Sequence, residues 1–251
     1  MTLSTKTGLI LIGDELLNGS RQDKHMAKSI EILRQRGMQL GWVRIVTDEI
    51  EALVQTFKET MATNDIVFSF GGIGATPDDL TRQSAAQALG VKLTSHPEAV
   101  KLIEDKFGEQ AYPNRILMSE LPEGSDIIPN PINQVPGFKL ANHHFVPGFP
   151  SMSWPMVEWV LDTHYAHLFD DDPDVDWRWQ LTGAIESDLL GMMNQLLDTF
   201  PAVRLSSLPN TKNRHQIDFG LKGKKDKVAE AATWFEAFMR KHNFQFTRSD
   251  S

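Results

Sequence analysis

Six residues that could bind a phosphate follow an apolar segment at residues 65–70. They are Gly71, Gly72, Gly74, Thr76, Asp78 and Asp79. Glycines let a backbone approach a ligand closely and adopt left-handed dihedral angles, so their N–H groups can surround an anion. Two carboxylates at the same place would repel a phosphate on its own, but they suit a divalent cation shared between acid and phosphate. We therefore expect a metal-assisted phosphate site in this segment.

The same segment also fits a purely structural interpretation. Thr76 is a favourable N-cap, Pro77 suits the first helical position, and acids in the first turn complement the helix dipole. The pattern therefore predicts a helix that begins at Thr76 and continues to about Gly90. An N-terminus there would itself favour an anion, so the two interpretations stay open at this stage.

A second group of acids follows the apolar run at residues 7–13, which is typical of a strand buried on both faces. Gly13, Asp14 and Glu15 come directly after it. A helix is predicted from Gln22 to Arg36, with Met26, Ile30 and Leu33 on its inward face. Farther along, a strand at residues 40–46 is followed by Asp48-x-x-Glu51, which resembles a capping box.

The elements of the first 90 residues alternate as βαβαβα, which indicates a parallel sheet with helices on both faces. Ligands of such sheets bind beyond the carboxyl ends of the strands. Asp14, Glu15, Asp78 and Asp79 all lie at such ends, so we expect them to converge. The region from 113 to 150 predicts short strands, including an antiparallel pair, and residues 152–168 a long helix.

The C-terminal third has a different pattern. Residues 170–176 form an acidic run, interpreted as a solvated linker. Residues 177–251 then read βαββαβ, the ferredoxin-like order. We expect one domain at 1–169, a linker at 170–176 and a small α+β domain at 177–251.

Composition excludes several classes of protein. The 251 residues contain no cysteine, which removes disulfides and thiol chemistry. Residues 1–173 carry 14 Lys and Arg against 23 Asp and Glu, a balance that argues against nucleic acid as a partner. No signal peptide and no apolar run of about 20 residues is visible. We therefore expect a cytoplasmic protein with no membrane contact. His143 and His144 are adjacent in a predicted strand and point to opposite faces, so they are not expected to share a metal.

Three motifs together resemble a known family. GDELLNG (13–19), GGIGATPDDLTR (71–82) and the corners PGF (136–138) and PGFP (147–150) are similar, in this order, to the MoaB/Mog-type molybdopterin-binding domain. The CinA-like (competence/damage-inducible) branch is the most similar, and the likeness covers about residues 5–168. The chain departs from that branch at Ala75, where a proline is usual, and over residues 21–25, where an Asn-Thr-Asn type of segment is common.

The resemblance implies a three-layer α/β fold with a mostly parallel sheet and a pocket for a phosphate-bearing pterin or nucleotide. It implies a metal-dependent hydrolase of a nucleotide diphosphate derivative such as ADP-ribose or FAD, that is, a nucleotide pyrophosphatase with a divalent cation of the Mg or Co class. Asp14 and Asp79 are the expected catalytic and metal-binding acids. Gly13, Glu15, Gly71, Gly72, Gly74, Thr76, Asp78, Asp23, Lys24 and His25 are the expected ligand contacts. The alternative is a molybdopterin- or nucleotide-binding module without turnover. A homo-oligomer is expected in either case.

Overall fold

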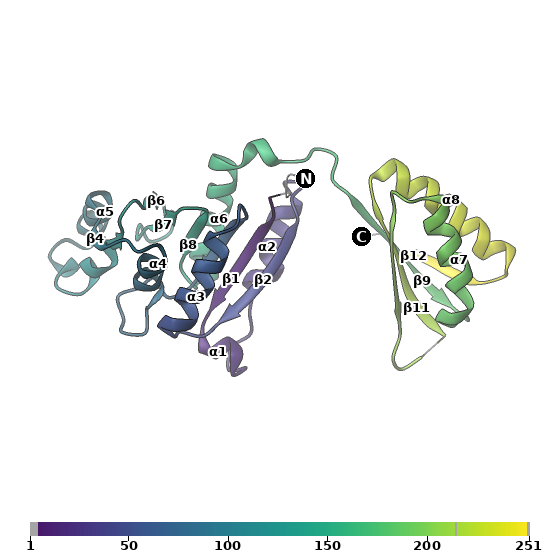
Figure 1. The fold of residues 1–251 in the computed structure, drawn as a ribbon, viewed down its shortest axis with the longest axis horizontal. Coiled ribbons are helices and arrows are strands. Elements are labelled where there is room, and N and C mark those ends of the chain that lie inside the picture. The colour runs from purple at the N-terminus through teal and green to yellow at the C-terminus, as the bar shows by residue number, and fades with distance from the viewer. Residues whose placement is uncertain (1–4, 214, 250–251) are drawn as a thin grey trace. The chain divides into compact units, whose positions relative to one another are not determined.

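A computed structural model describes residues 5–213 and 215–249, which divide into two compact units, Met1–Phe169 and Asp170–Ser251. Figure 1 follows the chain through both units by colour. Among the described residues, no helix is both long enough and apolar enough to cross a membrane.

The first unit alternates strands and helices and then adds a run of short strands. Its strands are β1 Thr7–Ile12, β2 Leu40–Val46, β3 Ile66–Phe70, β4 Leu93–Ser95, β5 Glu120–Pro122, β6 Asp126–Ile128, β7 Gly137–Leu140 and β8 His143–Val146. Its helices are α1 Asp14–Leu17, α2 His25–Arg34, α3 Ile50–Met61, α4 Thr81–Leu89, α5 Pro97–Phe107 and α6 Pro150–His164, with 3₁₀ turns at Gly108–Ala111, Arg115–Ser119 and Ala166–Leu168.

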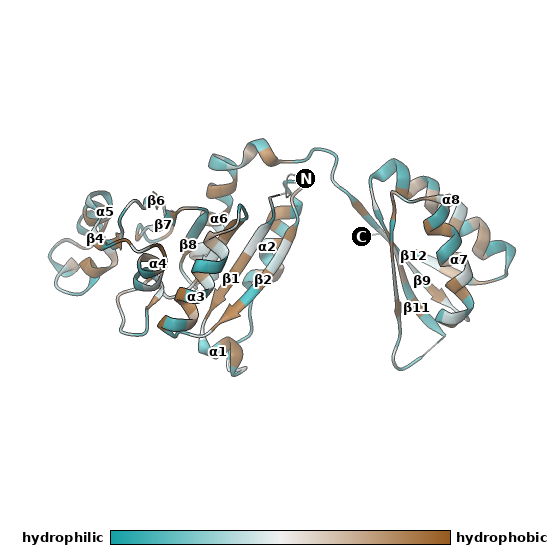
Figure 2. Cartoon of the chain, viewed as in Figure 1, coloured by the Kyte–Doolittle hydropathy of each residue, from teal (hydrophilic) through white to brown (hydrophobic). Residues whose placement is uncertain are grey.

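Six strands form the main sheet, in the order β2-β1-β3-β8-β7-β6. The first four are parallel, and β7 is antiparallel to both of its neighbours, β8 and β6. All residues of β1 and β3 are buried, and Figure 2 shows β1 mainly in the hydrophobic colour. The expected α/β fold with a mostly parallel sheet is therefore confirmed, including the antiparallel pair near residues 126–146.

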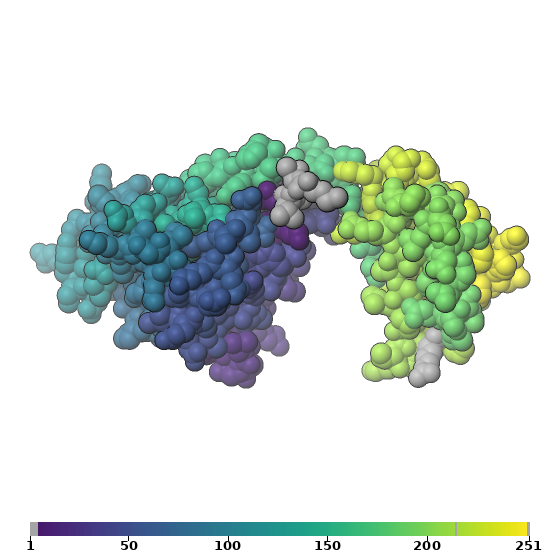
Figure 3. Space-filling model, in the orientation of Figure 1, coloured from purple at the N-terminus to yellow at the C-terminus, as the bar shows by residue number. Residues whose placement is uncertain are grey.

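Helices cover both faces of this sheet, which gives three layers. Leu9, Phe68 and Phe70 pack against α2 and α6 on one face. Ile10 and Val67 pack against α3, α4 and α5 on the other, where Leu53 and Phe57 are fully buried. Figure 3 shows the atoms of α3 in blue on the face turned to the viewer.

His143 and His144 lie on β8 and point to opposite faces, as the strand pattern predicts. His143 Nε2 lies 2.8 Å from Thr60 Oγ1 on α3, and His144 Nε2 accepts a hydrogen bond of 3.2 Å from the Tyr165 hydroxyl. Burial lowers the pKa of each imidazole to about 3. Both rings are neutral packing residues that join the sheet to its covering helices.

The second unit has the ferredoxin-like order βαββαβ predicted from its sequence. Its elements are β9 Val175–Thr182, α7 Glu186–Thr199, β10 Arg204–Pro209, β11 Gln216–Gly223, α8 Lys225–Lys241 and β12 Gln245–Ser249. The antiparallel sheet runs β10-β11-β9-β12, and Trp179, Phe219 and Phe235 form its core under the helices. β9 begins at Val175, so the last two residues of the range expected as linker, 175 and 176, belong to the strand. Lys224 Nζ also bonds Asp170 Oδ2 at 3.1 Å, so the acidic run is tied to this unit.

Two helix predictions in the first unit are wrong. α2 begins at His25 rather than Gln22, and its inward side carries His25, Ser29, Ile32 and Leu33, whereas Met26 and Ile30 are each 43% exposed. α4 begins at Thr81 rather than Thr76. Residues 76–79 form a turn instead, because the Asp79 carboxylate binds Thr76.

Candidate functional site

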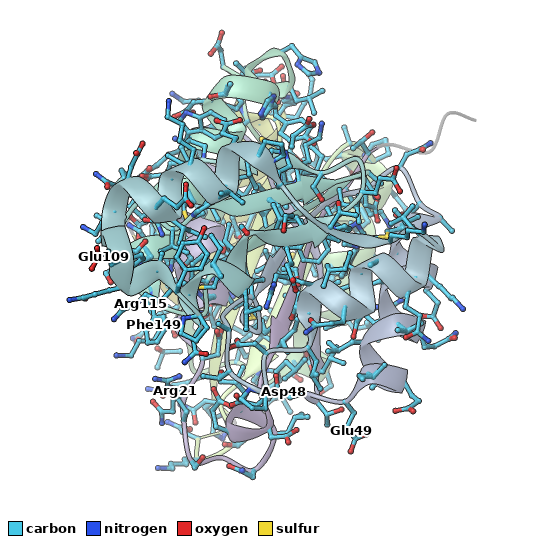
Figure 4. All side chains as sticks on the ribbon, turned by 90° about the vertical axis from the view of Figure 1, so that its left-hand side faces the viewer. Arg21, Asp48, Glu49, Glu109, Arg115 and Phe149 are labelled. Carbon is cyan, nitrogen blue, oxygen red and sulfur yellow. The ribbon has the colours of Figure 1, made fainter. Side chains whose placement is uncertain are left out.

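A cavity of about 940 Å³ opens at the carboxyl ends of β1, β2, β3 and β8. This is the edge at which parallel sheets bind their ligands. Of the twelve residues predicted from the sequence for the site, eleven line it: Gly13, Glu15, Asp23, Lys24, His25, Gly71, Gly72, Gly74, Thr76, Asp78 and Asp79. Asp14 does not line it. Figure 4 labels three side chains of the cavity wall, Arg21, Asp48 and Phe149.

The loop after β3 has glycine at the positions where a side chain would collide. Gly71 and Gly72 have φ values of 103° and 67°, in the left-handed region. Thr81 holds both residues, since its N–H donates to Gly72 O and its hydroxyl to Gly71 O, each at 3.0 Å. A Cβ on Gly72 would lie 2.3 Å from Thr81 Oγ1. Residues 71–72 are thus folded back onto the start of α4.

The backbone donors of this loop are available to a ligand. Within residues 5–213 and 215–249, no oxygen accepts a hydrogen bond from the N–H groups of Gly72, Ile73, Gly74 or Ala75. All four residues line the cavity and are half-buried. Successive unpaired N–H groups around glycines form a concave site suited to phosphate oxygens.

Asp79 fixes the turn that replaces the expected helix start. Its Oδ2 accepts from Thr76 N at 2.9 Å and from Thr76 Oγ1 at 2.5 Å. In an N-cap the hydroxyl of Thr76 would instead accept from the backbone. The carboxylate also lies against Gly74, where a Cβ would be 2.4 Å from Oδ2. Asp78 is exposed in the same turn.

Arg82 braces the loop from inside the protein. It is 3% exposed, and its guanidinium donates to the carbonyl oxygens of Gly74 (2.6 Å), Glu120 (2.9 Å) and Leu117. Burial lowers the pKa of Arg82 from its usual value, opposed by the charges of Glu120 and Asp79. A buried cation therefore lies directly behind the loop that carries the free N–H groups.

Asp14 and Asp48 form a reciprocal pair across the ends of β1 and β2. Asp14 N donates to Asp48 Oδ2 at 3.0 Å, and Asp48 N donates to Asp14 Oδ1 at 3.4 Å. The Asp14 carboxylate is turned to Asp48, whereas Asp48 is itself one of the residues that line the cavity. The expected capping box is therefore absent, and Glu49 is the N-cap of α3 without a side-chain hydrogen bond.

The surroundings of Asp48 favour its protonated form. Partial burial raises the pKa of Asp48, and the charges of Asp14, Glu15 and Asp78 raise it further, against the hydrogen bond from Asp14 N. A carboxylate with a raised pKa in a cleft is a candidate proton acceptor. Sequence reasoning missed Asp48 in this role. The sequence feature that could have identified it is its position after β2, which places it at the same sheet edge as Gly13 and Gly71.

The segment before α2 closes another wall. Asp23 Oδ1 and Oδ2 accept from His25 N (2.8 Å) and Met26 N (3.0 Å), so Asp23 caps the helix. His25 Nε2 lies 3.2 Å from Gly148 O and its ring packs 4.4 Å from that of Phe70. Because a carbonyl only accepts, Nε2 carries the proton. Burial lowers the pKa of His25, so a neutral imidazole joins α2 to the corner at 147–150.

Carboxylate oxygens suit a hard divalent cation, yet within the described residues no three His, Asp or Glu side chains are grouped as a ready-made metal site. Asp14 is bonded to Asp48 N, and Asp79 to Thr76. The donor set therefore fits a cation that takes the rest of its ligands from phosphate oxygens and water, as Mg²⁺ usually does.

Comparisons with known proteins agree with this architecture. Residues 8–167 match a family described as a probable molybdopterin binding domain. A protein of Pyrobaculum arsenaticum is 33% identical over 212 residues, which is 80% of this chain and 78% of the relative. A CinA-like protein of Syntrophotalea carbinolica is 31% identical over 155 residues, 59% of this chain but only 38% of that protein. The crystal structure of CinA from Thermoplasma acidophilum, of unknown function, superposes with a TM-score of 0.58 at 26% identity, over 63% of this chain and 96% of that one. The chain thus belongs to the MoaB/Mog-type molybdopterin-binding domain family, in its CinA-like branch.

Proposed function

We propose that the chain is a hydrolase of nucleotide diphosphate derivatives, with ADP-ribose and FAD as the candidate substrates. The observation that carries this proposal is one cavity in which the unpaired N–H groups of Gly72–Ala75 and the carboxylate of Asp48 are both present. The first can hold a phosphate, and the second can accept a proton from water.

The reaction on ADP-ribose would balance as follows. The oxygen of a water molecule forms a bond to one phosphorus, the anhydride P–O bond breaks, and AMP and ribose 5-phosphate are the products. Asp48 takes the proton of the attacking water, because partial burial and the neighbouring acids raise its pKa and make it a better base than an ordinary carboxylate. The N–H groups of the loop stabilise charge on the phosphate oxygens.

A divalent cation of the Mg or Co class belongs to this proposal. Asp79 would hold it together with the substrate phosphates and water, and Asp14 keeps Asp48 in place as the base. When bound, the cation would neutralise negative charge on the phosphate oxygens. This differs from the expectation that Asp14 itself binds metal, because its carboxylate is directed to Asp48.

The second candidate is a binding module for molybdopterin or a nucleotide, without turnover. It is favoured by the lack, within the described residues, of a preformed cation site, and by Asp79, whose Oδ2 is already bonded to Thr76. This candidate predicts saturable binding and no product.

AMP release distinguishes the two candidates. The full chain is incubated with ADP-ribose or FAD and with Mg²⁺, Mn²⁺ or Co²⁺. We expect AMP from the wild type and from Asp105→Asn, an exposed acid on α5 away from the cavity, and little from Asp48→Asn or Asp79→Asn. Equal AMP release by all four proteins would refute a hydrolytic role. Calorimetric binding without AMP would leave the binding module.

Three further expectations from the sequence stay predictions. They are a cytoplasmic location, a homo-oligomer, and domain boundaries at 169 and 177. Fractionation of cells checks the first, light scattering after size exclusion the second, and separate expression of the two parts the third.

A further inference from the structure

Phe149 is an exposed aromatic residue on the wall of the cavity. It is 57% exposed and is labelled in Figure 4. Among the described residues, no other aromatic ring packs against it and no cation lies over it. Burying a phenylalanine ring is worth a substantial free energy, so a ring left open on a cavity wall has apolar surface available to a ligand.

The backbone of Phe149 is held rigidly. Its carbonyl oxygen accepts from Met152 N and Ser153 N, both at 3.0 Å, and from the Ser153 hydroxyl at 3.1 Å. Pro150 restricts the backbone dihedral angles of Phe149, the residue before it, and the His25 ring contacts the carbonyl of Gly148 on the other side. The ring of Phe149 is therefore presented from a fixed corner rather than from a mobile loop.

This corner touches the phosphate-binding loop. Gly71 N donates to Val146 O at 3.0 Å, and a Cβ on Gly148 would lie 3.4 Å from Gly71 Cα. The exposed ring and the unpaired N–H groups of Gly72–Ala75 thus line one cavity on adjoining segments. Val135, Met118 and Phe107 also line the cavity, so it offers further apolar surface to a planar ring.

We propose that Phe149 is the stacking platform for the planar heteroaromatic ring of the ligand, whose phosphates lie on the loop at 72–75. The class of ligand is a purine, flavin or pterin ring joined to phosphate. This inference rests on the proposed function for the position of the phosphates, and it adds the residue that selects for a ring. Base–aromatic stacking tolerates different rings, because each has a π face.

The test compares ligands with and without a ring. Dissociation constants of ADP-ribose, FAD and inorganic pyrophosphate are measured by calorimetry for the wild type, Phe149→Ala and Phe149→Trp. We expect Phe149→Ala to weaken the binding of ADP-ribose and of FAD by about 5- to 150-fold. The affinity for pyrophosphate should stay unchanged. Phe149→Trp should retain the affinity. Leu190→Ala, which removes a side chain of α7 that is 58% exposed, is the matched control and should change none of the three constants.

Four other results would overturn the inference. Unchanged affinity of Phe149→Ala for ADP-ribose and FAD would show that the ring stays unused. An equal loss for pyrophosphate would show that Phe149 only shapes the loop, and a change of mass in light scattering without a change of affinity would assign it to a protein contact. A wild type that binds neither ring compound refutes the platform as well. Ring binding that depends on Phe149 but yields no AMP supports the platform and refutes hydrolysis, so the two proposals fail separately.

Discussion

The buried histidines of β8 make the first unit sensitive to acid. Each imidazole has a pKa of about 3 in the native state against 6.5 in an exposed environment. The unfolded chain therefore binds a proton at each histidine below pH 6.5, whereas the native state does so only near pH 3. The stability due to the neutral rings is fully present above pH 6.5 and is lost as the pH falls from 6.5 towards 3.

The size of the effect follows from those two pKa values. At pH 5 the unfolded histidine is almost fully protonated and the native one is not, which costs about 2 kcal/mol per histidine relative to pH 8. His143 and His144 together then cost about 4 kcal/mol, which is a large part of the stability of an ordinary domain. Replacing either ring by asparagine lowers stability at both pH values, but it should remove about 2 kcal/mol of the difference between them.

Urea unfolding at pH 8 and pH 5 measures that difference, with hydrogen exchange of β3 and β8 peptides to follow the first unit alone. His143→Asn and His144→Asn are compared with His167→Asn, whose ring lies at the surface. The reasoning is refuted if the wild type loses less than about 1 kcal/mol between pH 8 and pH 5. It is equally refuted if all three variants keep the wild-type difference.

Substitutions at three other residues test the site. Arg82→Met should lower the free energy of unfolding by about 2–4 kcal/mol, because buried carbonyl groups lose their donors, and Arg82→Lys should lower it by less. Equal urea midpoints for the wild type and Arg82→Met would show that Arg82 does not stabilise the loop. Gly74→Ala places a Cβ 2.4 Å from Asp79 Oδ2, so the affinity for phosphate, measured by calorimetry, should fall by at least about tenfold, that is about 1.4 kcal/mol. The free energy of unfolding should change little. An unchanged affinity would show that the loop accommodates the methyl group without losing its shape. The acidic limb of the pH–rate profile should lie above the pH typical of a free aspartate, because the pKa of Asp48 is raised, and Asp48→Asn should abolish that limb; a wild-type rate that is level down to about pH 4 would exclude Asp48 as the base.

Much of the fold could be predicted because its signals are local. The apolar run of β1 has no alternation, which is the mark of a strand buried on both faces, and all six of its residues are buried. The edge rule for parallel sheets then brought Gly13, Gly71 and Asp79 to one cavity. The βαββαβ order of the second unit follows in the same way from the alternation of its strands and helices.

The errors arose where a specific side-chain contact competes with a local motif. Thr76 has every local feature of an N-cap, but its N–H and hydroxyl both donate to Asp79, and the helix begins only at Thr81. On α2, Met26 and Ile30 follow the helical period, yet His25 faces inward because Gly148 accepts its Nε2–H. Asp48 matches a capping box in sequence, but Asp14 binds it across 34 positions of the chain. No window of neighbouring residues contains the pairs His25–Gly148 and Asp14–Asp48, whereas Asp79 lies only three positions after Thr76 and competes with the helix start locally.

These contacts have a common effect on the loop between β3 and α4. Thr81 fixes residue 71, Asp79 fixes residue 76 and Arg82 fixes residue 74. The loop therefore reaches its shape without a ligand. Binding a phosphate therefore does not require ordering of the loop, which is the usual advantage of preorganisation. Charges of opposite sign lie on the two sides of the loop. The cation of Arg82 is buried behind it, and Asp48, Glu15 and Asp78 line the cavity in front of it. A phosphate that entered alone would be attracted from behind and repelled from the front, and a divalent cation between acid and phosphate removes that repulsion. The arrangement of charge, more than any single residue, is the reason to expect that phosphate and cation bind together.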